Sequence, residues 1–223
     1  MAQLQSLLIL LLLYGMFFMA TLWAWKRKSD SLTSVLVNGQ WNLLHFRHLA
    51  GILLMLPVPF LFVPDLPFHL LLVPPDITGL QTILLTVIAL AGMLLGAIHA
   101  EKTIRNNFGM HQAGILQALM HLLLRSVFLV AYEWFFRGCI LFVCIKAFGL
   151  VPAIIINIFL YSLIHVFNKK ELIGSIPFGL LLCVFTVWCQ SIWPAVVLHW
   201  LLSVLYESVI LQSQLVKNQK YLT

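Results

Sequence analysis

Seven apolar runs, each close to the length of a membrane span, follow one another along this chain of 223 residues. They cover residues 5–25, 48–64, 81–99, 126–148, 152–167, 172–190 and 194–213. A helix rises about 1.5 Å per residue, so about 20 apolar residues cross the hydrocarbon core of a bilayer. Only 9% of the residues are charged, whereas soluble domains carry about 25% charged residues. We therefore expect an all-α membrane protein with about seven to eight transmembrane helices.

An eighth helix depends on residues 111–125, which are apolar but include His111, His121 and Arg125. Joined to the run 126–148, this segment would make a helix of about 38 residues, or about 57 Å, longer than one crossing requires. We therefore expect 111–125 to be a separate helix at the membrane interface, or a short extra span.

The formal net charge of +6 is distributed in a pattern typical of membrane loops. Basic residues predominate in segments 26–47, 100–110 and 168–171, whereas 65–78 holds two aspartates and no basic residue. Because basic loops stay on the cytoplasmic side, this alternation predicts seven crossings of the cell membrane. The N-terminus is then outside, while 111–125 and the C-terminus are cytoplasmic. The same pattern indicates a lipid bilayer as partner and argues against nucleic-acid binding.

The chain divides into three predicted parts. Residues 1–110 hold N-terminal transmembrane helices with short loops, 111–213 hold the polar residues, and 214–223 form a short cytoplasmic tail. The apolar run after residue 7 has no small-residue cleavage site, so we expect a retained first span. A proline-rich stretch over 56–75 predicts a stiff extramembrane loop after the second span. The oligomeric state is not predicted.

Three polar pairs with a spacing of four residues lie inside the apolar runs of the second half. They are Glu133–Arg137, Tyr161–His165 and His199–Ser203. Residues four apart share one face of a helix, and a charge at the centre of a span costs about 2.5–3.5 kcal/mol on insertion scales. Each pair has a structural interpretation, as a neutralising ion pair or as hydrogen-bonding contact between helices. Together they supply the carboxylate and two imidazoles that the activation of water requires.

These motifs resemble those of the CPBP family, the CAAX-processing and bacteriocin-processing membrane proteases also called the Abi family. The stretches that carry the resemblance are Tyr132–Gly138, Tyr161–His165, Pro177–Gly179 and His199–Ser203, over about residues 126–210. The family pattern is Glu-Glu-x-x-x-Arg-Gly, Phe-x-x-x-His and His-x-x-x-Asn or Asp on successive helices. The resemblance implies a CPBP-like helical core and glutamate-type hydrolysis of a peptide or protein substrate at or in the membrane.

The sequence departs from the family pattern at three positions. Tyr132 stands at the first glutamate, Tyr161 at the phenylalanine, and Ser203 at the final asparagine or aspartate. A phenol, with an ordinary pKa of about 10, is a poor base at neutral pH but can donate a hydrogen bond.

The resemblance then assigns the catalytic roles to three residues. Glu133 is expected to activate water, His165 to share that water, and His199 to stabilise the oxyanion. Arg137, Tyr132, Tyr161 and Ser203 are expected to support them. Glu207, two turns beyond His199, is a reserve carboxylate.

Other chemistries use the same residues. Glu133, His165 and His199 could supply three ligands of an open zinc site, but there is no HExxH motif and Arg137 disfavours a cation, so we expect no metal and no cofactor. Two further functional classes stay open. One is a catalytically degenerate CPBP-fold protein acting as a peptide-binding, immunity or assembly factor. The other is a small proton-coupled transporter.

The predicted spans place the three catalytic residues at different depths. Glu133 and His165 are expected toward the cytoplasmic side and His199 toward the outer side. Their convergence therefore predicts a short, tilted or irregular path for the chain between 172 and 198.

Overall fold

The computed structural model describes residues 2–63, 66–72, 77–106 and 113–220, and the side chains of 3–215 within these ranges. His111, Asp65 and Asp76, used above, lie outside them. The described residues form helices and no strand. The helices are α1 (Ala2–Lys26), α2 (Leu32–Asn38), α3 (Trp41–Met55), α4 (Pro57–Phe62), α5 (His69–Leu72), α6 (Gly79–Asn106), α7 (Ile115–Glu133), the π-helix η1 (Trp134–Ile140), α8 (Leu141–Phe148), α9 (Leu150–Leu163), α10 (Lys169–Cys189) and α11 (Trp193–Lys220).

Six helical stretches among the described residues are long and apolar enough to cross a membrane, and α9 is a shorter apolar helix. With 14 residues, α9 spans about 21 Å, less than the hydrocarbon core of about 30 Å. Counted with α9, the stretches make seven, the lower of the predicted numbers. The prediction of an all-α, multi-pass membrane protein is confirmed.

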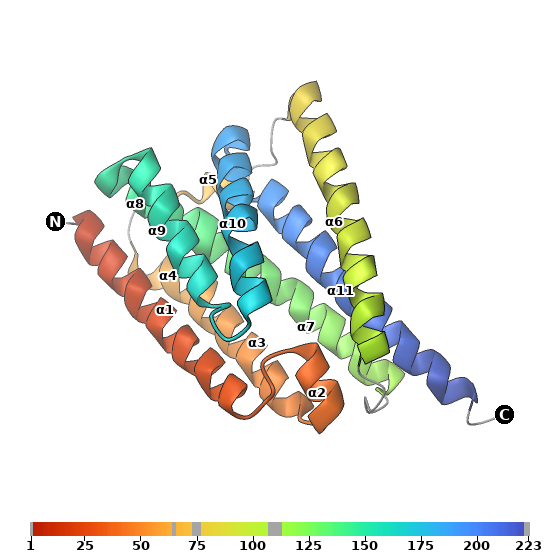
Figure 1. Ribbon diagram of the computed structural model, residues 1–223. Helices are drawn as coiled ribbons and strands as arrows, with labels where there is room; N and C mark the ends of the chain where they lie inside the picture. Colours follow the sequence, from red (N-terminus) through yellow and green to blue (C-terminus); the bar gives the residue numbers. More distant parts are fainter. Residues whose placement is uncertain (1, 64–65, 73–76, 107–112, 221–223) are drawn as a thin grey trace.

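Residues 115–148 form one continuous helical stretch of 34 residues, made of α7, η1 and α8. The prediction that 111–125 is a separate interface helix or extra span is therefore wrong from residue 115 onward. The prediction assumed that a helix of this length is too long for one crossing. This stretch runs obliquely to α10 (Figure 1), and an oblique path accommodates a longer helix. Its polar residues also need no interface, since α7 packs against α3 and α11 inside the bundle.

The proline-rich stretch is partly helical, contrary to the prediction of a loop. Pro57 and Pro59 lie in α4, which continues the second span to Phe62. Proline is tolerated at the first turn of a helix because the amide that it lacks would have no partner there. Pro64, Pro74 and Pro75 lie outside the described residues.

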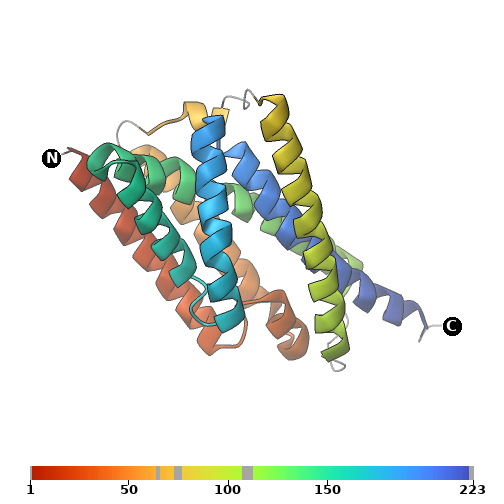
Figure 2. The same cartoon turned by 45° about the horizontal axis from the view of Figure 1, so that its top comes forward.

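The ends of the helices alternate as the charge pattern predicts. In both ribbon views the N-terminal end of α1 lies toward the upper edge, whereas the C-terminal ends of α1, α6 and α11 lie toward the lower edge (Figures 1 and 2). The N-terminal end of α10 lies toward the lower edge as well. Lys26, Arg105 and Lys169 thus share one end of the bundle, which we call the basic end. Its cytoplasmic location stays a prediction.

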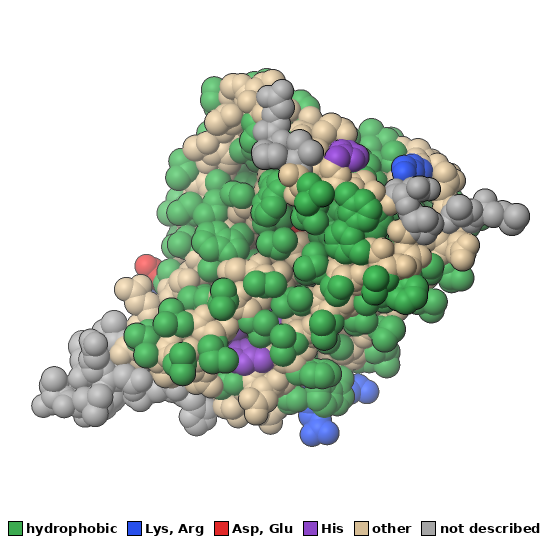
Figure 3. Space-filling view, turned by 180° about the vertical axis from the view of Figure 1, so that it is seen from behind, with side chains coloured by type: hydrophobic (Ala, Val, Ile, Leu, Met, Phe, Trp, Pro, Cys, Tyr) green, Lys and Arg blue, Asp and Glu red, His purple; other side chains and the backbone are tan. Residues whose placement is uncertain are grey.

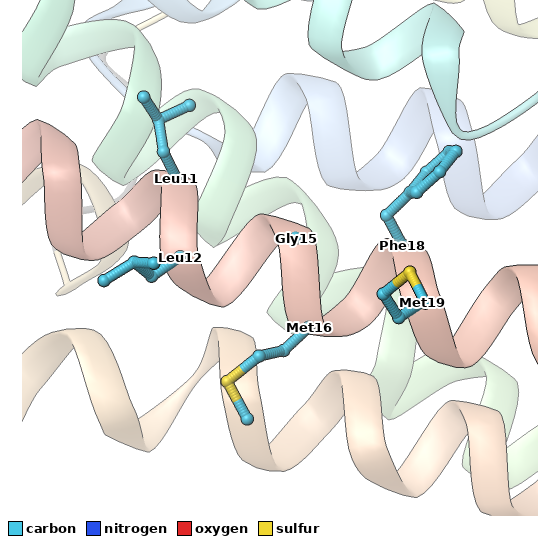
Figure 4. A pocket seen from close by; sticks show the side chains of 6 residues that line it. All are labelled: Leu11, Leu12, Gly15, Met16, Phe18 and Met19. Atoms are coloured by element: carbon cyan, nitrogen blue, oxygen red, sulfur yellow. The ribbon is translucent and has the colours of Figure 1, made fainter.

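The outer surface is suited to lipid. Seen from behind, it is largely hydrophobic and carries few charged side chains (Figure 3). A groove of about 640 Å³ on α1 is lined by Leu11, Leu12, Gly15, Met16, Phe18 and Met19. These side chains carry no polar atom able to act on a substrate (Figure 4), so the groove is not a candidate active site.

The π-helix η1 is a feature that the sequence analysis did not predict. Its seven side chains are all buried, and π turns inside helices are frequent at functional sites. Gly138 is required there by close packing, because a Cβ atom would lie 2.4 Å from the Trp134 ring. That ring cannot move aside easily, since it is fully buried and stacks on Phe60 at 5.3 Å.

Gly138→Ala is therefore expected to destabilise the protein by about 1–3 kcal/mol through overpacking. A thiol-reactive fluorophore can follow thermal unfolding, because all four cysteines are buried in the folded chain. Gly15→Ala is the matched control, since a Cβ there meets nothing within 4 Å. Equal unfolding temperatures for the two variants would contradict the packing argument.

Candidate active site

The centre of the site is a buried carboxylate that joins two helices. His199 Nδ1 on α11 donates a hydrogen bond of 2.6 Å to Glu133 Oε1 at the end of α7. Arg137 Nη1, one turn further along in η1, lies 3.1 Å from Glu133 Oε2. Glu133 and Arg137 are fully buried and His199 is 7% exposed. We call Glu133, Arg137 and His199 the Glu133 site.

Arg137 is held by an aromatic ring as well as by the carboxylate. Its Cζ atom lies 4.2 Å from the centroid of the Tyr161 ring, within cation–π distance. Gly179 of α10 makes room for this ring, because a Cβ there would lie 3.0 Å from Tyr161 Cδ1. Phe178 packs edge-on against His199 with ring centroids 5.6 Å apart. The Pro177–Gly179 motif therefore shapes the wall of the site.

Tyr132 lies beside the Glu133 site. Its ring meets His199 and Tyr161 edge-on, with centroids 5.9 Å and 5.8 Å away. The Tyr132 hydroxyl is buried and has no hydrogen-bond partner within the described part of the chain. Buried hydroxyls are normally paired, so this group is available to a molecule bound at the site.

His165 lies in the turn after α9, one ring away from the carboxylate. Its Nδ1 is 3.4 Å from Glu171 Oε2, and its ring centroid is 5.4 Å from that of Tyr161. The structure shows no contact between His165 and Glu133 among the described hydrogen bonds and ion pairs. His165 Nε2 is buried and unpaired in the same residues.

Ser203 and Glu207 follow His199 along α11 and stand apart from Glu133. Ser203 is partly buried, and its hydroxyl makes no hydrogen bond within the ranges that the structure describes. Glu207 belongs to a different cluster, where it pairs with His121 and Arg125. The structure therefore brings Glu133, Arg137, His199, Tyr132 and Tyr161 together, with His165 adjacent.

The expected difference in depth between Glu133 and His199 does not exist. Because α7 begins at Ile115 and not near residue 126, Glu133 lies in the middle of its helical stretch and at the level of His199. The irregular path predicted between 172 and 198 is mostly absent, since α10 is one helix over Lys169–Cys189 with Pro177 inside it.

Asn157 is a polar residue of the site that the sequence analysis missed. This fully buried side chain donates from Nδ2 to the Phe136 carbonyl of η1 at 2.6 Å. Its Oδ1 accepts from Cys183 Sγ at 3.2 Å. Asn157 thus ties the π-helix to α9 and α10. An asparagine inside an apolar run was the signal that could have identified it.

No group of three or more His, Cys, Asp or Glu side chains is arranged to hold a metal ion in the described residues. At the Glu133 site, the group that accompanies Glu133 and His199 is the guanidinium of Arg137, which is itself a cation.

Apolar helices long enough to cross a membrane thus surround a buried glutamate, arginine and histidine, which defines a multi-pass membrane protein with a polar site in its interior. Residues 114–205 match the family model described as type II CAAX prenyl endopeptidase Rce1-like. The matched segment is less than half of the chain, and within it the resemblance to the CPBP family seen in the motifs is confirmed. Comparisons with curated proteins and with solved structures give no match.

Proposed function

We propose that the chain is an endopeptidase of the cell membrane that hydrolyses a peptide bond at the Glu133 site. The family match gives a protease fold of the CAAX or CPBP type. The observation that carries the proposal is the 2.6 Å hydrogen bond between Glu133 and His199, two residues 66 positions apart. It joins a carboxylate to an imidazole, the pair by which many hydrolases prepare a base.

The geometry favours His199 as the base and Glu133 as the residue that orients it. An ionised carboxylate can only accept, so Nδ1 of His199 carries a proton and Nε2 of the neutral ring is free to take one. Glu133 is already engaged by His199 and Arg137, which makes it a weaker base. This division of roles differs from the sequence prediction, in which Glu133 activates water and His199 stabilises the oxyanion.

Tyr132 and His165 supply the remaining contacts in this proposal. The Tyr132 hydroxyl is a donor for the oxygen that becomes negative when water attacks the peptide carbonyl. His165 Nε2 accepts a hydrogen bond from the attacking water. Both atoms are buried and unpaired in the described residues, as expected for groups that a bound peptide and water would satisfy.

The substrate is proposed to be a peptide or protein that reaches the site from the membrane or from the basic end. Because Glu133 and Arg137 are fully buried, the helices must part for cleavage to occur. Following the charge pattern, the N-terminus is placed outside the cell and the C-terminus in the cytoplasm.

The test is cleavage by the purified protein in lipid vesicles. Suitable substrates are a farnesylated CAAX peptide, chosen from the description of the matched family, and a mixed peptide library read by mass spectrometry. The wild-type chain is expected to release a product.

Tyr132→Glu separates this proposal from the degenerate alternative. A second carboxylate next to Glu133 is expected to lower stability and activity, because two like charges in a buried site disfavour one another. Tyr132→Phe, which keeps the ring, is the matched variant and should lower the cleavage rate by about 10²-fold or more as an oxyanion donor is lost. Cleavage by Tyr132→Glu alone, with an inactive wild type, would instead show a degenerate peptidase.

A further inference from the structure

A second buried polar cluster joins α3, α7 and α11 toward the basic end of the bundle. His121 Nε2 lies 3.0 Å from Glu207 Oε2, and Arg125 Nε lies 3.5 Å from Glu207 Oε1. Arg125 Nη1 also reaches His48 Nε2 at 3.5 Å. We call these four residues the Glu207 cluster. Such ionisable groups within spans are costly and often mark function.

The Glu207 cluster repeats the chemistry of the Glu133 site on the same pair of helices. Each has one glutamate, one histidine hydrogen-bonded to it and one arginine ion-paired with it. Glu207 follows His199 by eight residues, about 12 Å along α11. Between the two sites lie the rings of Phe128 and Tyr132, whose centroids are 5.5 Å apart.

Hydrogen bonding fixes which atoms of the Glu207 cluster are free. Arginine has only donors, so His48 Nε2 accepts from Arg125 and His48 Nδ1 carries the proton of the neutral ring. An ionised glutamate has only acceptors, so His121 Nε2 donates to Glu207, and in the neutral ring His121 Nδ1 is a free acceptor. Both Nδ1 atoms are buried and unpaired among the described residues, and the two rings are 5.7 Å apart.

A free donor and a free acceptor can both be satisfied by a neutral group that accepts and donates hydrogen bonds. Water and the peptide amide have this property, whereas a carboxylate cannot donate and an ammonium ion cannot accept. Water and peptide backbone are therefore ligands that match the free atoms of the cluster.

The charged side chains of the Glu207 cluster are less completely buried than those of the Glu133 site. The side chains of Arg125 and Glu207 are 16% and 11% exposed, whereas those of Glu133 and Arg137 are 0% exposed. His121 and Arg125 lie in the N-terminal third of the helical stretch 115–148, and Glu207 lies near the middle of α11. The N-terminal end of α7 and the C-terminal end of α11 both point toward the basic end (Figure 1).

We propose that the Glu207 cluster is the solvent-reached polar entrance to the Glu133 site, where water and the substrate backbone are held on the way in. Its role toward a substrate rests on the proposed function. Its access to water does not, and the experiment measures that access.

The first measurement uses the wild-type chain in lipid vesicles. A water-soluble carbodiimide with glycinamide is expected to couple Glu207 and to leave Glu133 unmodified, as read by mass spectrometry. Glu101, exposed near the end of α6, is the positive control. If Glu101 reacts and Glu207 does not, the cluster is a sealed ion pair and the proposal fails.

The second measurement gives the side of access. His48→Cys leaves the contacts among Glu207, His121 and Arg125 in place. An anionic thiosulfonate is expected to label it within about tenfold of the rate of Arg27→Cys, the control exposed at the basic end. Leu123→Cys, whose native side chain is 69% exposed on the apolar surface of α7, and the wild type with its buried cysteines should stay unlabelled.

Labelling of His48→Cys only from the side that does not label Arg27→Cys, or no labelling of folded protein, would overturn the proposal. Both measurements are read without cleavage. An inactive chain that is labelled therefore refutes the peptidase and supports the entrance, and an active chain that is not labelled does the reverse.

Discussion

Glu133→Gln is expected to abolish cleavage and to lower the unfolding temperature, whereas adding Arg137→Met should restore only the stability. In the single variant, the guanidinium of Arg137 is left fully buried without a counter-charge. Breaking one partner of a buried ion pair costs about 3–5 kcal/mol, whereas replacing both partners by apolar groups is often neutral. Cleavage needs the carboxylate itself, and loss of an orienting carboxylate lowers rates by about 10⁴-fold in hydrolases that use one.

The comparison needs cleavage rates and unfolding temperatures for the two variants and for Glu101→Gln. Glu101 is exposed near the end of α6, so its replacement should change neither quantity. A double variant that is both stable and active would show that Glu133 only neutralises Arg137. A single variant as stable as the wild type would show that the pair is not energetically coupled.

His199→Gln is expected to lower the cleavage rate by about 10²–10⁴-fold with little change in stability. The glutamine amide can still donate a hydrogen bond to Glu133, but it cannot take a proton from water. His199→Phe removes the donor as well, and should cost about 1–3 kcal/mol because the buried Glu133 carboxylate loses its shortest hydrogen bond.

Ser208→Ala is the matched control on the same helix, since the Ser208 hydroxyl donates to the Val204 carbonyl one turn earlier in α11. Cleavage rates measured against pH sharpen the test, because a histidine base requires its neutral form and activity should fall as that ring is protonated. A His199→Gln variant with wild-type activity would exclude His199 as the base and return that role to Glu133.

Much of the site was predictable because its residue types are incompatible with lipid. Glu133, Arg137 and His199 stand out in apolar runs whatever their partners are, and the i, i+4 spacing of Glu133 and Arg137 makes them neighbours on any helix. The identity of the partner across helices was not predictable. Pairwise spacing says nothing of whether His199 or His165 meets the carboxylate, and the structure shows His199 in contact with it and His165 paired with Glu171.

Residues 115–125 belong to the long helical stretch 115–148, although the length of that stretch predicted a break. The prediction of a break assumed that each helix crosses the bilayer perpendicular to its plane. It also assumed that the charged Arg125 side chain lies at the membrane interface. The bundle instead supplies Glu207 and His48 to Arg125 and lets one oblique helix run through its interior. Partners on other helices lower the free-energy cost of burying the charge of Arg125. A hydropathy profile contains no information about such partners.

By itself, the sequence determined the class of protein and singled out the polar residues that lie inside its apolar runs. Long apolar runs with few charges leave only helices in lipid, because every backbone polar group must be paired within its own segment. The tertiary structure decided the π-helix held by Asn157, the Glu133–His199 hydrogen bond and the second polar cluster at Glu207. Each of these depends on side chains from helices far apart in the chain, whose distances are set by packing and not by spacing.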